Sequence, residues 1–178
     1  MLSTGIVGSL KKKEGKKTIA LRADMDALPI QETAVLTFSS ERKGIMHACG
    51  HDVHMAVLLG TARVLSEIQN NINGSIKFIF QPAEETTGGA KRMIKRGCLE
   101  PKTDFILGLH VKPDLPAGAI GIKYGKVHAA SDMFKIAVKG KHSHGAYPEL
   151  GIDAIAAASQ LVTGIQSIVS RNVSPLNN

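Results

Sequence analysis

Residues 18–26 read Thr-Ile-Ala-Leu-Arg-Ala-Asp-Met-Asp, a short apolar run that passes directly into two aspartates. An apolar run of this length, bounded by turn residues, is typical of a buried β-strand. Two more such runs follow, at residues 75–80 and 105–109. Between the runs, apolar residues at steps of three and four predict a helix over about 53–68, and a short basic helix is expected over 88–96. This alternation predicts the α/β fold class, a parallel or mixed sheet with crossover helices.

The apolar pattern changes after residue 116. Alternating residues predict strands over 119–123 and 134–139, the second with one solvent-facing side, as in an antiparallel sheet. A broad apolar stripe predicts a helix over 152–169. We therefore place a domain boundary near 125–130 and expect two units, residues 1–126 and 127–178. One strand and one helix cannot cover their own apolar faces, so the second unit is expected to be incomplete.

The composition is that of a soluble globular protein. The chain has 178 residues, of which 43% are apolar and 21% charged, enough for one domain or one domain and part of another. No apolar stretch is long enough to cross a bilayer, so no membrane association is expected. Positive charge follows the first apolar residues instead of preceding them, which argues against a secretory signal and predicts the cytoplasm. Two cysteines are too few for a disulfide scaffold, and free thiols are expected.

The net charge of +7 is concentrated near the N-terminus. In residues 11–17 five lysines less one glutamate give +4, which leaves +3 for the rest of the chain. Because there is no tryptophan and no aromatic residue among these lysines, a surface that stacks single-stranded nucleic acid is not expected. We favour a solvated lysine-rich turn and no nucleic-acid partner. Binding of a polyanion by this turn stays open as a weaker alternative.

Polar residues with catalytic or ligand chemistry follow each predicted core strand. In parallel α/β sheets, sites form where the carboxyl ends of strands meet. The loop before the first helix adds a dense run of imidazole, thiol and carboxylate groups at residues 47–54. Thiolate, imidazole and carboxylate together suit zinc and its first-row neighbours rather than magnesium or calcium. The candidates are Asp24, Asp26, Cys49, His51, Asp52, His54, Glu84, Glu85 and His110.

Electrostatics also favour a cation at this edge of the sheet. Two carboxylates about 4 Å apart repel by roughly 4 kcal/mol at an effective dielectric constant near 20, and four acids would converge here. In extended backbone, residues i and i+2 point the same way, so Cys49 can converge with His51. Structural alternatives remain: Asp52 as the N-cap of the helix, His54 as a first-turn residue, and Cys49 as a small core residue.

Five motifs in order resemble those of the metal-dependent amidohydrolases, which include aminoacylases, hippurate hydrolases and hydrolases of indoleacetic acid conjugates. The resemblance covers nearly the whole chain. It implies a zinc-peptidase-like α/β domain, followed by part of a small α+β, ferredoxin-like lid or dimerisation domain. The motifs are LRADMDALP at residues 21–29, MHACGHD at 46–52, QPAEE at 81–85, GLHV at 108–111 and GAYP at 145–148.

The resemblance also implies roles for individual residues. Glu84 would be the general base and Asp26 an acidic residue that supports the metal site. His144 would come from the lid domain, across a subunit interface, to bind either the developing oxyanion or the substrate carboxylate. The four implied metal ligands are Cys49, His51, Glu85 and His110.

The reaction implied by the resemblance is hydrolysis of an N-acyl amino acid to a carboxylate and a free amine. It implies two divalent transition metals per complete site (Zn, Mn, Co or Ni) and a homodimer through the lid domain. Family members are roughly twice as long, and the later part of their catalytic domain supplies a further histidine ligand that has no counterpart here. A fragment is therefore expected, and the alternative is a truncated, catalytically inactive metal-binding remnant.

Overall fold

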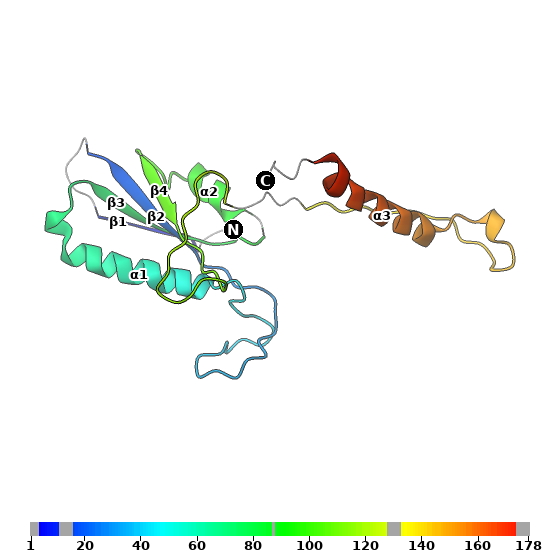
Figure 1. Cartoon of the computed structure of the whole chain (residues 1–178), viewed down its shortest axis with the longest axis horizontal. Coiled ribbons are helices and arrows are strands. Elements are labelled where there is room, and N and C mark those ends of the chain that lie inside the picture. The colour runs from blue at the N-terminus through cyan, green and yellow to red at the C-terminus, as the bar shows by residue number, and fades with distance from the viewer. Residues whose placement is uncertain (1–3, 11–15, 87, 128–132, 174–178) are drawn as a thin grey trace. The chain divides into compact units, whose positions relative to one another are not determined.

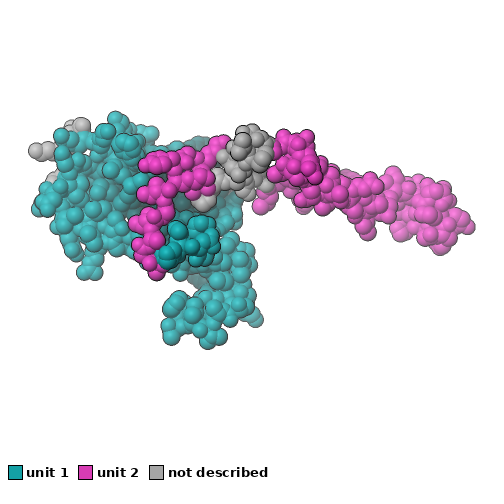
Figure 2. Space-filling view, in the orientation of Figure 1, with its two compact units in different colours: residues 1–116 teal, residues 117–178 magenta. Residues whose placement is uncertain are grey.

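The computed structural model describes residues 4–10, 16–86, 88–127 and 133–173 (Figure 1). The chain divides into two compact units, Met1–Pro116 and Ala117–Asn178 (Figure 2). The sequence-based boundary near 125–130 stays a prediction, and residues 128–132 lie outside the described part of the chain. The same is true of residues 11–15, which make up most of the predicted lysine-rich turn.

The first unit is built on a four-stranded mixed sheet with the strand order β1-β3-β2-β4. Strand β2 (Thr18–Asp24) runs parallel to both β3 (Ser75–Gln81) and β4 (Phe105–Gly108). Strand β1 (Ile6–Leu10) pairs with β3 in the antiparallel sense. The three predicted core strands and the α/β fold class are thus confirmed.

Helix α1 (His51–Glu67) lies along one face of the sheet (Figure 1). Its buried residues are His51, His54 and Leu58, which share one helix face at steps of three and four. Leu58 packs in the core with Ala23 and Phe78. The two histidines continue the same face beyond the apolar core, so the first turn of α1 presents imidazoles to the sheet. Helix α2 (Gly89–Lys95) is short and follows β3.

The strand register brings the carboxyl ends of three strands together. Asp24 pairs with Gln81 at the end of β3, and Arg22 pairs with Gly108 at the end of β4. The residues that follow each strand therefore emerge at one edge of the sheet, next to the first turn of α1. This edge positions the candidate site.

The second unit contains helix α3 (Ala154–Asn172), as predicted, and the short 3-10 helix Pro148–Leu150. Asp153 caps α3 by accepting hydrogen bonds from the amides of its first turn. The predicted strands at 119–123 and 134–139 were wrong: in the described residues neither segment pairs with a neighbour, and a strand requires a hydrogen-bonded partner. None of the described helices combines the length and the apolar character that a membrane crossing requires.

Candidate metal centre

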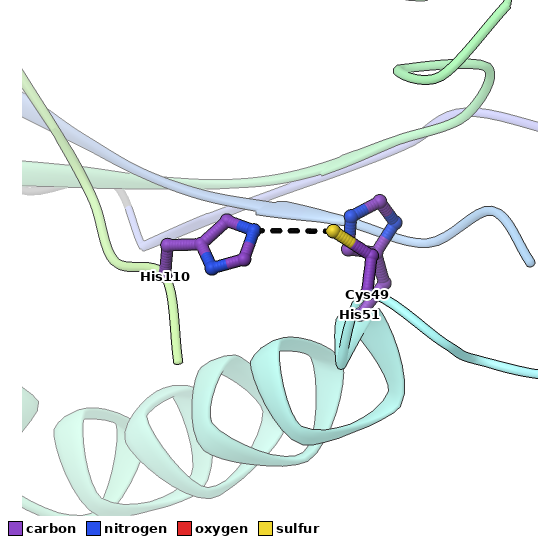
Figure 3. Close-up of side chains that lie close together, drawn as sticks. All are labelled: Cys49, His51 and His110. Atoms are coloured by element: carbon purple, nitrogen blue, oxygen red, sulfur yellow. Dashed lines mark hydrogen bonds between the residues drawn. The ribbon is translucent and has the colours of Figure 1, made fainter. Parts of the chain in front are cut away.

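Three side chains with metal-binding chemistry converge at the edge of the sheet (Figure 3). His110 reaches in from the loop after β4 and points at Cys49, which lies beside His51 at the start of α1. The distance from Cys49 Sγ to His110 Nε2 is 3.4 Å. In tetrahedral zinc sites, Zn–S bonds of about 2.3 Å and Zn–N bonds of about 2.0 Å place the two ligand atoms roughly 3.5 Å apart. The pair is thus spaced like two ligands of one ion.

Gly50 makes the convergence of its two neighbours possible. It is the N-cap of α1 and has φ 79°, in the left-handed region that favours glycine. A Cβ at this position would also overlap Cγ2 of Val111, the residue after His110. Glycine is therefore required here both by the backbone conformation and by the close approach of the loop after β4. Asp52 is exposed in the first turn and is not the N-cap, so that alternative was wrong, and α1 begins two residues earlier than predicted.

His51 offers a lone pair that no described group uses. Its Nδ1 lies 2.9 Å from the backbone carbonyl of Asp26, and since a carbonyl only accepts, Nδ1 carries the proton. Nε2 is then an acceptor, buried and without a hydrogen-bond partner in the part of the chain that the structure describes. Leaving a buried acceptor unpaired costs about 1–3 kcal/mol. A metal ion would satisfy this lone pair, because ligating histidines typically donate their other nitrogen to a carbonyl or carboxylate in this way.

Asp26 holds two of the predicted ligands. Its carboxylate Oδ2 accepts a hydrogen bond of 3.0 Å from the backbone amide of Glu85, while its carbonyl accepts from His51. The side chain of Glu85 is 26% exposed, and its Oε1 lies 3.9 Å from His51 Nε2. Glu84 is more exposed, yet its carboxylate lies within 4.8 Å of the ligand atoms of His51 and Glu85. Ala83, directly before the two glutamates, has φ 55°, in the left-handed region.

The acidic surroundings of Cys49 keep its thiol protonated when no metal is bound. Burial, a hydrogen bond to Glu85 and the negative charges of Glu85, Glu84 and Asp24 raise the pKa of Cys49 to about 11. A bound cation reverses this effect, because a coordinating thiol is deprotonated outright. Sulfur, imidazole nitrogen and carboxylate oxygen together form a donor set that fits a divalent transition metal.

The structure brings together six of the seven predicted site residues. His144 belongs to the second unit, where its Nδ1 accepts a hydrogen bond of 3.1 Å from the Ala146 amide, and its predicted role stays a prediction. The six that lie at the sheet edge are Asp26, Cys49, His51, Glu84, Glu85 and His110.

Sequence reasoning left one part of this region unassigned, the buried pair Asp24 and His54. His54 Nδ1 lies 2.6 Å from Asp24 Oδ1, and Asp24 is 2% exposed. Arg22, which was not singled out, donates to the other oxygen of Asp24 at 2.7 Å. The three-residue step from His51 to His54 was the available signal, since it places both imidazoles on one helix face.

Comparisons with known proteins are consistent with this geometry. The family model of peptidase family M20/M25/M40 matches residues 20–176. An N-acetylcysteine deacetylase of Bacillus subtilis (strain 168) is 49% identical over 177 residues, which are 99% of this chain and 46% of that protein. An N-acyl-L-amino acid amidohydrolase of Geobacillus stearothermophilus is 48% identical over 174 residues, 97% of this chain and 47% of that protein.

A solved structure is also similar. The Bacillus subtilis YXEP protein, described as a dinuclear metal binding peptidase from the M20 family, superimposes with a TM-score of 0.66 at 48% identity. The match covers 70% of this chain and 35% of that one. The chain spans about half the length of the curated relatives it matches.

Proposed function

The chain belongs to peptidase family M20/M25/M40, and from that membership we propose that it forms part of a metal-dependent amidohydrolase acting on N-acyl amino acids. The observation that carries the proposal is the buried Nε2 of His51, which has no hydrogen-bond partner among the described residues and lies in one group with Cys49 and His110. The names of the relatives, an N-acetylcysteine deacetylase and an N-acyl-L-amino acid amidohydrolase, support the substrate class.

We propose four ligands on this chain: Cys49, His51, Glu85 and His110. His51 belongs both to the group with the thiol and to the group with the two glutamates, an arrangement that suits two ions side by side. A divalent metal held there (Zn, Mn, Co or Ni) supplies Lewis-acid activation of water. Asp26 orients two of the ligands, His51 through its carbonyl and Glu85 through its carboxylate.

Glu84 is proposed as the general base. Its exposed carboxylate lies beside His51 and Glu85, open to solvent and substrate. Water adds its oxygen to the acyl carbon and the C–N bond breaks, while Glu84 takes the proton of the water and delivers it to the departing nitrogen. The second proton of the water leaves the acid product, which becomes a carboxylate, and protonates the released amine, so that atoms and charge balance.

The second unit is proposed to serve substrate binding and assembly. His144 is exposed, and a donor imidazole suits either an oxyanion or the substrate carboxylate. Apolar residues of this unit such as Phe134 and Ile155 are 68% and 79% exposed, which supports a homodimer contact through residues 127–178.

Activity with defined metals tests the function. The chain is loaded with Zn²⁺, Mn²⁺ or Co²⁺ and assayed on N-acetyl and N-benzoyl amino acids, beside Glu84→Gln as the variant that loses the base but keeps the proposed ligands. Turnover that disappears in Glu84→Gln at unchanged metal content supports the amidohydrolase. Metal binding without turnover by the chain supports the alternative, a catalytically inactive metal-binding remnant. Absence of metal binding contradicts both.

A further inference from the structure

A chain of hydrogen bonds connects the centre of the sheet to the loop that carries His110. Arg22 Nη1 donates to Asp24 Oδ2 at 2.7 Å, and His54 Nδ1 lies 2.6 Å from Asp24 Oδ1. At its other end, His54 Nε2 accepts a hydrogen bond of 2.9 Å from the backbone amide of Val111. This series of hydrogen bonds therefore connects β2, α1 and the loop after β4.

The hydrogen bonds fix which nitrogen of His54 carries the proton. A backbone amide only donates, so Nε2 of His54 accepts from Val111 and the proton resides on Nδ1, which donates to Asp24. Both nitrogens of His54 are then occupied, and both carboxylate oxygens of Asp24 are occupied by His54 and Arg22. Although Asp24, His51 and His54 lie close enough to hold an ion, His54 retains no lone pair to offer it.

Both backbone polar groups of Val111 form hydrogen bonds. While its amide donates to His54, its carbonyl lies 2.7 Å from Nδ1 of His110 and accepts the proton of that nitrogen. Nε2 of His110 is thereby left to face Cys49 Sγ, the geometry of a metal ligand. The backbone of Val111 thus helps to orient the His110 ring and favours the tautomer with the proton on Nδ1.

Strand pairing holds β4 only as far as Gly108, and in the part of the chain that the structure describes apolar packing adds little beyond it. Residues 105–110 are all exposed, so apolar packing does not fix the end of this strand. Val111 is only half-buried and contacts Gly50 across the site. His54 is 1% exposed, and a hydrogen bond of a buried group is worth more than one in water. The hydrogen bond that His54 accepts from Val111 is therefore a principal anchor of the segment that carries His110.

We infer that His54 is a positioning residue, which holds the ligand His110 in place through the Val111 backbone and is itself held by Asp24 and Arg22. The inference rests on the proposed metal site. His54 neither binds the ion nor contacts substrate in this arrangement. Its contribution is to keep His110 pointed at Cys49 before the metal arrives.

Three substitutions separate the two bonds of His54. His54→Gln places an amide oxygen near the position of Nε2 and keeps an acceptor for the Val111 amide. His54→Asn places an amide nitrogen near Nδ1, which keeps the bond to Asp24 but loses Val111. His54→Phe keeps a ring and loses both bonds. His142→Gln, at an exposed histidine in the second unit, serves as the control.

The first measurement is the dissociation constant of Co²⁺, with the thiolate-to-cobalt absorption as the spectroscopic signature. By analogy with other residues that orient metal ligands, His54→Asn and His54→Phe are expected to weaken binding about 10- to 100-fold, and His54→Gln by less than about fivefold. Equal affinity in all variants, or an Asn variant as strong as the Gln variant, would overturn the inference. If the Phe variant does not fold, the Asn and Gln variants still decide.

The second measurement uses the metal-free chain. Hydrogen exchange of the Val111 amide and the ¹⁵N shifts of the His110 ring, observed by NMR, report the anchor directly. We expect faster exchange and loss of the single His110 tautomer in the Asn and Phe variants and near-native values in the Gln variant. If the wild-type chain binds no Co²⁺, the proposed function fails, while unchanged exchange in His54→Asn would contradict the positioning role by itself.

Discussion

His51 contacts Asp26 through both the backbone and the side chain of that aspartate: Nδ1 lies 2.9 Å from the carbonyl oxygen and 3.4 Å from carboxylate Oδ1. The carbonyl contact survives any substitution of the side chain, whereas the carboxylate contact does not. The hydrogen bond that Asp26 Oδ2 accepts from the amide of Glu85 depends on the side chain as well. Asp26 is therefore expected to act mainly through Glu85.

Substitutions of Asp26 test this division. Asp26→Ala is expected to lower the affinity for Zn²⁺ about 10- to 100-fold, the usual cost of losing a group that orients a ligand. Asp26→Asn retains an oxygen that can accept from the Glu85 amide, so its loss should be smaller. Competitive Zn²⁺ titration measures both, and an Ala variant that binds like wild type would show that Glu85 needs no such support.

Metal affinity should increase with pH because of Cys49. Its pKa of about 11 means that the thiol is protonated at neutral pH, and binding must release that proton. Between about pH 7.5 and about pH 9 the apparent Zn²⁺ affinity should rise about tenfold per pH unit from this group. Calorimetry in buffers of different ionisation enthalpy counts the released proton. The same slope in Cys49→Ala would contradict the assignment.

The ionised carboxylate of Asp24 should stabilise the native state, and this contribution should be lost at acid pH. Burial by itself raises its pKa, but the hydrogen bond from His54 and the neighbouring guanidinium of Arg22 act in the opposite direction, and the pKa is held below 3.8. The native state thus favours the carboxylate. Its contribution is present above pH 3.8 and is lost as the pH falls through the lowered native pKa.

The variant Asp24→Asn tests the contribution of the Asp24 charge. Urea unfolding of the metal-free chain should show a deficit of about 1–3 kcal/mol at neutral pH, from partners left unsatisfied. The deficit should shrink at acid pH, because wild type then also loses the charge. A deficit that grows towards acid pH would have the wrong sign for this carboxylate.

A side chain should be less well tolerated at Gly50 than at Gly44, a glycine with a similar backbone conformation. Gly44 has φ 75° and open space around its missing Cβ, whereas a Cβ at Gly50 would overlap Val111. Gly44→Ala is expected to cost about 1–2 kcal/mol from the left-handed conformation alone. Gly50→Ala should cost more and should also weaken metal binding. Thermal unfolding and Co²⁺ titration of both variants make the comparison, and equal losses would exclude a role for the Val111 contact.

Helix α3 should drive self-association. Ile155, Val162 and Val169 are spaced seven residues apart on one side of the helix, and they are 79%, 60% and 72% exposed. Replacing all three with lysine is expected to shift the chain from oligomer to monomer, as followed by light scattering over a range of concentrations. A wild-type chain that is monomeric at high concentration would contradict this prediction.

The core of the fold and the location of the site were predictable because they depend on local patterns. Apolar runs identify β2, β3 and β4, and the rule for parallel strands then places Asp26, Glu85 and His110 at one edge. The start of α1 was placed two residues late, because Gly50 caps the helix through its conformation and not through a side chain.

Two other features were beyond sequence reasoning for a physical reason. The role of His54 depends on Val111, which is 57 positions away and is brought near by strand pairing. The segments at 119–123 and 134–139 alternate like strands, but alternation describes which faces could be buried and does not supply a hydrogen-bonded neighbour.

The order of the strands has a consequence for how metal binding reports on folding. Cys49 and His110 are 61 positions apart and meet only when β4 has joined the exposed edge of β2. Detachment of that one strand would dismantle the donor set while leaving β1, β2 and β3 paired. A substitution that weakens the pairing of β4, for example at Ile106, should therefore lower the metal affinity before it unfolds the rest of the sheet. Bound metal then indicates whether this strand is paired with β2.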